Sequence, residues 1–486
     1  MKILFVTPEC APMVKTGGLG DVSAALPAAL AERGSDVAVL MPAYGDMPVA
    51  GTLTAIFALP AEAAWPAAQL MRVEQLNGPV LLLLSCPALY SRASTPYGHP
   101  GADAHLQALG FGLLAHTAAR IGSAATPCGW QADVVHANDW PCALAPLYLR
   151  QRRDAGDTSA ARSVMTVHNL AFQGVFPMSV ADALQIEPLH RGIDGVEYWG
   201  DLSMLKAGLQ FADAITTVSP TYAREMQEPA LGFGLDGVLR ARSAHLHGLI
   251  NGIDTRVWNP ATDTLIAHRY LASDLSGKAR NTEWLRAKCG LAASEGPLFG
   301  LVGRLTSQKG VDLVLAGAAP LLAQGGQLVV LGKGDPQLEQ ELAQLAARNP
   351  MQVAVSFQFD ERLAHSIEAG ADCFLMPSRF EPCGLNQMYS QAYGTPPLVT
   401  PTGGLADTVE DADDTLTTGT GFVMQNTSQA AFDQAVRRVV QAWEKPAAWK
   451  SLQLRCMQKD FSWQHAALPY IDLYRSIAEP ARTRPA

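Results

Sequence analysis

The sequence predicts an α/β protein with two doubly wound, Rossmann-like domains, one in each half of the chain. Short apolar runs alternate with helical patterns along residues 3–250, and a second series of the same kind occupies residues 298–424. This alternation is typical of parallel sheets that are covered by helices. The chain has 486 residues, of which 48% are hydrophobic and 17% are charged, so it can bury the cores of two domains.

The individual elements follow from the pattern of each segment. A strand, a Gly-rich loop and a helix that ends at Gly34 open the chain, as in a doubly wound sheet. Residues 251–262 are rich in Asn, Gly, Asp and Pro, and we place the domain boundary there. The expected strands are residues 3–6, 37–41, 80–85, 133–136, 164–167, 215–218 and 246–250 in the first half, and 298–302, 328–331, 353–357, 373–376, 398–400 and 421–424 in the second.

Composition and charge exclude several classes of partner. The net charge is −9 and no Lys/Arg run is present, whereas nucleic-acid-binding proteins usually carry a basic face. No stretch of about 18 apolar residues suggests a membrane span. The eight cysteines form neither C-x-x-C pairs nor zinc-binding spacings, and the first residues contain no signal-peptide core. We therefore expect a cytoplasmic protein that binds neither nucleic acid nor a membrane.

The Gly-rich loop after the first strand reads KTGGLGD, from Lys15 to Asp21. It is not G-x-G-x-x-G, and no acid follows the second strand, so a dinucleotide cofactor is poorly supported. Gly17 and Gly18 would still let backbone N–H groups approach a phosphate closely.

Polar residues and glycines follow strand after strand at the same edge of both predicted sheets. In doubly wound proteins, ligands bind at the carboxyl ends of the parallel strands. Each residue alone has a simpler explanation, such as a surface charge, a helix cap or a hydrogen-bonded histidine, but their shared placement favours a site. These residues are Lys15, Asp139, His168, Asn169, Asn251, Arg304, Lys309, Thr402, Gly403 and Gly404.

The stretch SRFEPCGLNQ, residues 378–387, lies between an expected strand and an expected helix. It carries one carboxylate, Glu381, just before a helix N-terminus, which offers free N–H groups and a partial positive charge to an anion. The neighbouring residues of interest are Cys383, Gly384 and Leu385.

This set of side chains suits transfer of a group from a diphosphate-activated donor. Arg304, Lys309 and Lys15 could neutralise a leaving phosphate, and Glu381 could hold sugar hydroxyls. The chain has no Walker A loop, no zinc cluster and no G-x-S-x-G elbow.

Five motifs in both halves of the chain resemble those of bacterial glycogen synthases, a group that includes the plant starch synthases. The resemblance extends from Lys2 to about Tyr474, which is nearly the whole chain. The motifs are KTGGLGD at 15–21, SPTYARE at 219–225, RLTSQKG at 304–310, SRFEPCGLNQ at 378–387 and TGGLADTV at 402–409.

The resemblance implies the retaining GT-B glycosyltransferase fold, in which two Rossmann-like domains face a deep cleft. It also implies transfer of glucose from ADP-glucose to the non-reducing 4-OH of glycogen or another α-1,4-glucan, without a metal or other cofactor. The implied domains are residues 1–252, 253–460 and a C-terminal helix in 461–486 that packs back on the first domain.

Motif by motif, the resemblance implies catalytic roles for Glu381, His168, Asp139 and Lys15. Tyr97 and Asn169 are expected on the acceptor side. The residues expected to bind the donor are Lys15, Gly17, Gly18, Asp21, Asn251, Arg304, Lys309, Cys383, Gly384, Leu385, Thr402, Gly403 and Gly404.

Two residues depart from related patterns. Many GT-B enzymes carry a second Glu eight residues after the first, where this chain has Tyr389, and Lys333 occupies a turn where the family often has a small residue. The alternatives are another GT-B transferase or epimerase, or an inactive glucan-binding homologue.

Overall fold

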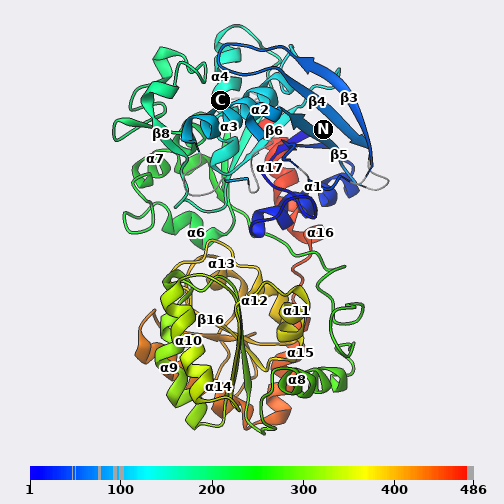
Figure 1. The fold of residues 1–486 in the computed structure, drawn as a ribbon, viewed down its shortest axis with the longest axis vertical. Coiled ribbons are helices and arrows are strands. Elements are labelled where there is room, and N and C mark those ends of the chain that lie inside the picture. The colour runs from blue at the N-terminus through cyan, green and yellow to red at the C-terminus, as the bar shows by residue number, and fades with distance from the viewer. Residues whose placement is uncertain (46, 50, 75–77, 91–95, 98–102, 479–486) are drawn as a thin grey trace, which may run out of the picture. The chain divides into compact units, whose positions relative to one another are not determined.

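The computed structural model describes residues 1–45, 47–49, 51–74, 78–90, 96–97 and 103–478. Contacts divide the chain into two compact units (Figure 1). Unit 1 comprises Met1–Gly252 and the residues from Trp463 onward, and unit 2 comprises Ile253–Ser462. Both contain parallel sheets covered by helices, which confirms the predicted fold class.

Unit 1 is built on a sheet with the strand order β12-β11-β7-β6-β1-β2-β5-β4-β3, in which β12 through β5 are parallel. These seven parallel strands are the seven that the sequence predicts. Their bounds are β1 Lys2–Val6, β2 Asp36–Pro42, β5 Val80–Ser85, β6 Val134–Asn138, β7 Arg162–Val167, β11 Ala214–Thr217 and β12 Leu246–Gly248.

Five further strands in unit 1 are absent from the sequence prediction. β3 and β4 extend the sheet as antiparallel strands, and β8, β10 and β9 form a small antiparallel sheet. β3 is mostly exposed and has no regular alternation of apolar and polar residues, so its sequence carries no clear signal. Their bounds are β3 Thr52–Leu59, β4 Ala68–Glu74, β8 Val175–Pro177, β9 Glu197–Tyr198 and β10 Asp201–Ser203.

The helices of unit 1 cover both faces of its main sheet. Every helix in the described part of the chain is too short or too polar to span a bilayer. The α-helices are α1 Gly18–Glu32, α2 Pro87–Tyr90, α3 Ala104–Ile121, α4 Ala145–Asp154, α5 Met204–Phe211, α6 Pro220–Glu225, α7 Asp236–Ala241, α16 Trp463–Ala466 and α17 Leu468–Ala478. The 3-10 helices are η1 Trp140–Cys142, η2 Met178–Val180, η3 Pro188–His190 and η4 Ser243–His245.

Unit 2 is built on a six-stranded, wholly parallel sheet with the order β15-β14-β13-β16-β17-β18. All six strands were predicted. Their bounds are β13 Leu298–Val302, β14 Gln327–Leu331, β15 Val353–Ser356, β16 Cys373–Met376, β17 Pro397–Val399 and β18 Phe422–Val423. The helices are α8 Ser276–Lys288, η5 Ser307–Lys309, α9 Val311–Ala323, α10 Pro336–Arg348, α11 Glu361–Gly370, α12 Asn386–Ala392, α13 Gly403–Thr408, α14 Gln429–Trp443 and α15 Pro446–Met457.

The core of unit 2 lies on both faces of this sheet. Leu328 and Val330 of β14 belong to one buried cluster with residues of α9 and α14, whereas Val329 and Leu331 belong to a second cluster with α8 and α11. Successive side chains of a strand point to opposite faces, so a strand buried on both faces reads as one continuous apolar run.

The chain enters and leaves unit 2 at adjacent positions. Ile253 N donates to the carbonyl of Phe461 at 2.8 Å, and Ile253 also forms a parallel bridge with Ser462. On the unit 1 side, Gly252 is packed so closely against Trp463 that an added Cβ would lie 2.8 Å from its backbone nitrogen. The boundaries between the two units therefore lie between residues 252 and 253 and between residues 462 and 463.

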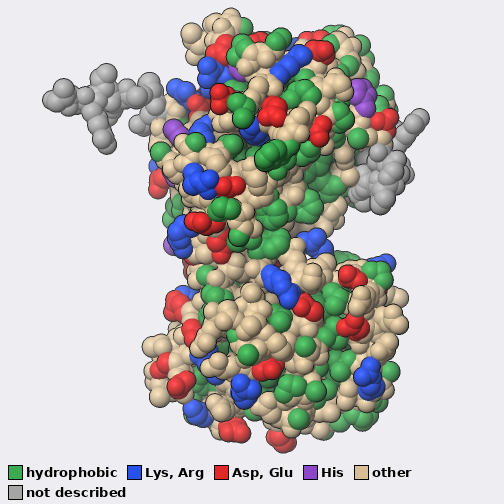
Figure 2. All heavy atoms as spheres, turned by 90° about the vertical axis from the view of Figure 1, so that its left-hand side faces the viewer, with side chains coloured by type: hydrophobic (Ala, Val, Ile, Leu, Met, Phe, Trp, Pro, Cys, Tyr) green, Lys and Arg blue, Asp and Glu red, His purple; other side chains and the backbone are tan. Residues whose placement is uncertain are grey.

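The C-terminal helices are integrated into unit 1. The hydroxyl of Tyr474 on α17 lies 2.7 Å from Nδ1 of His136 on β6, and both side chains are fully buried. Arg33, which follows α1, donates to the carbonyl of Gln464 on α16. On the face of the molecule in Figure 2, acidic and basic side chains are interspersed over each unit.

Candidate active site

In unit 1, the Gly-rich loop connects β1 to α1. Gly17 is the N-cap of α1, and no side chain caps the first turn through it. A helix N-terminus without a side-chain cap leaves backbone N–H groups for an anion. Lys15 Nζ lies 2.8 Å from Asp21 Oδ1, and 47% and 33% of these two side chains are exposed. The predicted residues Lys15, Gly17, Gly18 and Asp21 therefore form one accessible polar turn.

Glu9 holds this loop in place through hydrogen bonds to Thr16, a role that the sequence did not predict. Its carboxylate accepts hydrogen bonds from Thr16 N at 2.6 Å and from Thr16 Oγ1, and the residue is 1% exposed. Burial raises its pKa against the lowering effect of the Thr16 hydrogen bonds. A single acid between Pro8 and Cys10 belongs to no motif, so only the folded chain reveals its role.

Asp139 and His168 meet at the carboxyl ends of β6 and β7. One oxygen of Asp139 accepts a hydrogen bond from His168 N at 2.7 Å, and His168 Nε2 lies 3.0 Å from Asn138 Oδ1. Asp139 precedes η1 but does not cap it through its side chain, and its φ of 54° is unusual for a residue other than glycine. The structure therefore brings these two predicted residues together in a fixed arrangement.

Burial favours the neutral form of both side chains, Asp139 and His168. It raises the pKa of the Asp139 carboxyl to about 7, although the N–H groups of His168 and Asn169 oppose this shift. It lowers the pKa of His168 to about 3, so its imidazole is neutral near pH 7.

The raised pKa of Asp139 should make stability depend on pH. An acid whose pKa rises on folding stabilises the folded state below its ordinary pKa, here 3.8, and this contribution is lost as the pH rises through about 7. Because Asp139→Asn cannot ionise, we expect its melting temperature relative to wild type to increase between pH 4 and pH 7 and then to stay constant. Calorimetry from pH 4 to pH 8 measures this difference, and a constant difference over the whole range would contradict the assignment.

The two residues expected on the acceptor side lie near this pair. The ring of Tyr97 is 6.3 Å from that of Trp140, and burial together with Glu9 and Asp139 raises the pKa of Tyr97. Asn169 Oδ1 accepts a hydrogen bond from Ala171 N at 3.0 Å. Ala171 borders a hollow of about 400 Å³ that is also lined by Trp140, Phe172, Gln173, Gly174, Val175 and Tyr198.

Asn251, the last predicted site residue of unit 1, is 4% exposed. Its Oδ1 atom is buried and accepts no hydrogen bond from the described residues. An unpaired buried acceptor is costly, and this atom has no access from the surface, so the structure does not place Asn251 against a ligand.

In unit 2, the loop after β16 carries Glu381, which is 6% exposed. Glu381 Oε2 accepts hydrogen bonds from Lys309 Nζ at 2.5 Å and from Ser378 Oγ at 3.1 Å. The sequence predicted a sugar-binding carboxylate and a phosphate-binding cation, and the structure shows that the two form a direct ion pair. Ser378 lies inside the recognised motif, but nothing in the sequence indicated its contact.

Arg304 follows β13 and is exposed. Within the described part of the chain its side chain forms no ion pair, hydrogen bond or ring contact, in contrast to that of Lys309. Its guanidinium is therefore available to a phosphate, which it can bind through two parallel N–H donors.

Two glycines after β17 pack directly on the Glu381 loop. Gly404 N donates to the carbonyl of Glu381 at 3.1 Å, and an added Cβ on Gly403 would lie 2.0 Å from that same oxygen. A Cβ on Gly404 would lie 2.1 Å from the carbonyl of Cys383. Residues 381–384 and 402–404 thus form one close-packed backbone unit that brings together the predicted Cys383, Gly384, Thr402, Gly403 and Gly404, with Leu385 at the start of α12.

The two departures from related sequences have different surroundings. Tyr389 stacks on Trp258 with ring centroids 3.8 Å apart, and Trp258 stacks on His365 at 3.9 Å. An aromatic stack thus occupies the position where many GT-B enzymes carry a second carboxylate. Lys333 is exposed, and its carbonyl accepts a hydrogen bond from Leu305 N at 3.0 Å.

Two family descriptions match this chain. The starch synthase catalytic domain matches residues 2–241, and glycosyl transferases group 1 matches residues 287–452.

Curated relatives match over nearly their whole length. A glycogen synthase from Paracidovorax citrulli (strain AAC00-1) is 63% identical over 492 residues, which cover 100% of this chain and 97% of that protein. A glycogen synthase from Dechloromonas aromatica (strain RCB) is 51% identical, with 98% of each chain covered.

Solved structures agree with this result. The catalytic domain of starch synthase IV from Arabidopsis thaliana, bound to ADP and acarbose, superposes with a TM-score of 0.87 at 32% identity, covering 98% of this chain and 99% of that one. A sucrose-phosphate synthase from Thermosynechococcus elongatus, at 19% identity and a TM-score of 0.60 with 98% of each chain covered, shares the fold.

Proposed function

This chain belongs to the glycogen and starch synthase family of glycosyltransferases, and from that premise we propose that it elongates α-1,4-glucans. It transfers glucose from ADP-glucose to the non-reducing 4-OH of glycogen or a related glucan, with retention of configuration. The observation that carries the assignment of the site is the ion pair between the buried carboxylate of Glu381 and the partly exposed Lys309, at the carboxyl edge of the unit 2 sheet.

The donor is held by cations and by backbone N–H groups. When the bond between the anomeric carbon and the diphosphate breaks, negative charge grows on the leaving phosphate oxygens. Arg304 and Lys309 stabilise that charge, and Lys15 supplies a third cation. Glu381 accepts hydrogen bonds from glucose hydroxyls while it remains paired with Lys309.

His168 and Asp139 act at the glucose and the acceptor. A neutral imidazole can exchange hydrogen bonds with sugar hydroxyls without placing another positive charge near the anomeric carbon. Asp139 holds the backbone of His168 in place and can itself accept a hydrogen bond from a sugar hydroxyl. Tyr97, Asn169 and the hollow beside Trp140 receive the acceptor glucan.

The test is an assay with two donors and two readouts. The protein is incubated with glycogen and either ADP-glucose or UDP-glucose, and both nucleoside diphosphate release and glucose incorporation are followed. We expect incorporation with ADP-glucose. Sugar interconversion without incorporation would identify an epimerase, and binding of glycogen without release would identify an inactive homologue.

The proposed reaction requires no metal. In this proposal Arg304, Lys309 and Lys15 would neutralise the two phosphates, a role that Mg²⁺ fills in many other nucleotide-dependent enzymes. We expect undiminished initial rates after exhaustive dialysis against EDTA. Loss of activity that is restored by adding Mg²⁺ would contradict this expectation.

The proposed compartment is the cytoplasm. None of the eight cysteines forms a disulfide, and six of them are buried. Buried thiols without disulfides fit a reducing environment.

A further inference from the structure

Arg379 lies two residues before Glu381, and the proposed reaction gives it no role. Its guanidinium forms a two-pronged ion pair: Nη1 donates to Asp312 Oδ1 at 2.7 Å, and Nη2 donates to Asp312 Oδ2 at 2.6 Å. Asp312 belongs to the first turn of α9 and follows Lys309 by three positions. The pair therefore connects the segment that carries the buried carboxylate to the segment that carries its cation.

Further hydrogen bonds of Arg379 join the same two segments. Its backbone N–H donates to the carbonyl of Gln308 at 2.8 Å, and its Nη1 also donates to the carbonyl of Ser307. Ser307 and Gln308 precede Lys309, whereas Asp312 follows it. Arg379 therefore contacts the chain on both sides of Lys309 in the sequence.

The location of the Lys309 ammonium depends on such support. Lys309 ends the short 3-10 helix η5, and Gly310 after it has a left-handed φ of 71°. An added Cβ on Gly310 would lie 2.0 Å from the carbonyl of Pro377, so the backbones of the two segments are in close contact there. A lysine side chain is flexible, so its Nζ stays 2.5 Å from Glu381 Oε2 only if the backbone of Lys309 is held in place.

The ion pair between Arg379 and Asp312 is suited to fixing a position. About two fifths of each side chain is exposed, at 38% and 40%, and exposed ion pairs add little to overall stability. Two parallel N–H donors on one carboxylate, however, fix the direction of approach as well as the distance. Hydrogen bonds from Arg379 are the largest cause of the lowered pKa of Asp312, so its carboxylate is ionised near pH 7.

We propose that Arg379 and Asp312 are positioning residues for glucosyl transfer, which hold Lys309 at the place where its ammonium meets the leaving diphosphate. The kinetic part of this inference rests on the proposed function, whereas the structural part does not. Neither residue touches the substrate in this role. Displacement of a catalytic group by about 1 Å can cost roughly 100-fold in rate, so a contact outside the reacting centre can still control kcat.

Asp312→Asn separates positioning from direct electrostatics. The variant keeps the shape of the side chain but removes one negative charge and one of the two acceptors. By electrostatics alone, loss of a negative charge near a leaving diphosphate leaves the rate unchanged or raises it. Loss of positioning lowers it. We expect Asp312→Asn and Arg379→Ala each to lower kcat by about 10- to 100-fold in steady-state assays with ADP-glucose and glycogen.

The same substitutions in a Lys309→Ala background show which group they act through. Neither should lower kcat further, because the position of an absent ammonium has no effect on the rate. A wild-type kcat in Asp312→Asn would overturn the proposal. So would a full additional loss from Arg379→Ala in the Lys309→Ala background, since Arg379 would then act on the substrate directly.

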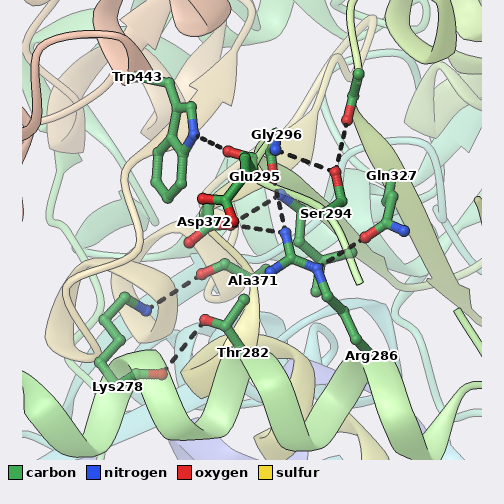
Figure 3. Close-up of polar contacts among 12 residues, drawn as sticks. Lys278, Thr282, Arg286, Ser294, Glu295, Gly296, Gln327, Ala371, Asp372 and Trp443 are labelled. Atoms are coloured by element: carbon green, nitrogen blue, oxygen red, sulfur yellow. Dashed lines mark hydrogen bonds and ion pairs between the residues drawn. The ribbon is translucent and has the colours of Figure 1, made fainter. Parts of the chain in front are cut away.

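Arg286 provides a matched control at the other end of β16 (Figure 3). Its Nε donates to Gln327 Oε1 at 2.8 Å, and one terminal nitrogen donates to the carbonyl of Gly296 at 2.7 Å. That nitrogen also lies 3.9 Å from Oδ2 of Asp372, which directly precedes β16. Arg286→Ala should lower the melting temperature but leave kcat at the wild-type value. An equal loss of kcat in this control would show that general loosening of the sheet sets the rate, and would overturn the proposal.

A second measurement needs no substrate. The melting temperatures of wild type, Lys309→Ala, Glu381→Gln and the double variant give the coupling between the ammonium and the carboxylate. The same four proteins with Arg379→Ala added should show a much smaller coupling, because Lys309 is no longer held against Glu381. An unchanged coupling would overturn the structural part of the inference.

The melting experiment also distinguishes this inference from the proposed function. A reduced coupling in a protein that transfers no glucose from ADP-glucose would support the positioning role and refute the synthase proposal. Glucose transfer together with an unchanged coupling would do the reverse.

Discussion

Glu381→Gln should lower kcat by at least about 100-fold while the protein remains folded. The carboxylate is nearly buried and is held by Lys309 and Ser378, so its charge contributes to the field at the donor sugar. Glutamine has the same shape and can still accept from Ser378, which limits structural damage. Steady-state kinetics with saturating ADP-glucose and glycogen measure the effect.

A matched control is available in the same unit. Glu410 pairs with Lys459 at 2.5 Å, but 65% of the Glu410 side chain is exposed, so Glu410→Gln removes a carboxylate from a similar pair on the surface. It should retain wild-type kcat, since exposed ion pairs contribute little. Near wild-type turnover in Glu381→Gln would remove this residue from the mechanism.

Arg304→Ala and Lys309→Ala should each lower kcat by roughly 100-fold or more, because each removes a cation from the leaving diphosphate. Their effects on stability should differ. Arg304 is exposed and unpaired among the described residues, so its loss should leave the melting temperature unchanged. Lys309→Ala leaves Glu381 buried without its cation, which should cost about 1–3 kcal/mol of unfolding free energy.

Kinetics and calorimetry on the same preparations test this pair of variants. Lys459→Ala, which removes the cation of the surface pair, serves as the control and should change neither quantity. An effect of Arg304→Ala confined to the KM for glycogen would show that Arg304 acts on the acceptor and not on the donor.

The parallel strands were predictable because burial on both faces produces a local signal. A run such as Leu328–Leu331 is apolar throughout, and Gly and Pro mark the turns between such runs. β3 gave no such signal, because it is a mostly exposed strand at the edge of the sheet and pairs only with β4, in the antiparallel direction. Its position depends on pairing with β4 and not on its own composition.

Motifs identified the site residues, but their mutual contacts come from the fold. Lys309 and Glu381 are 72 positions apart, and no pattern within either segment indicates that they share a hydrogen bond. The contacts of Glu9 and Ser378 could not be predicted either, because each residue acts through a hydrogen bond to a neighbouring site residue: Glu9 to Thr16, and Ser378 to Glu381. The stack of Tyr389 on Trp258 likewise joins two segments that the sequence leaves unrelated.

The paired entry and exit of unit 2, at Ile253 and Ser462, have a consequence for synthesis on the ribosome. Unit 2 is one uninterrupted segment, so it can fold as soon as that segment has emerged. Unit 1 lacks α16 and α17 until all of unit 2 has been translated, and until then His136 has no Tyr474 beside it. The first unit to begin synthesis is therefore the last to complete its core.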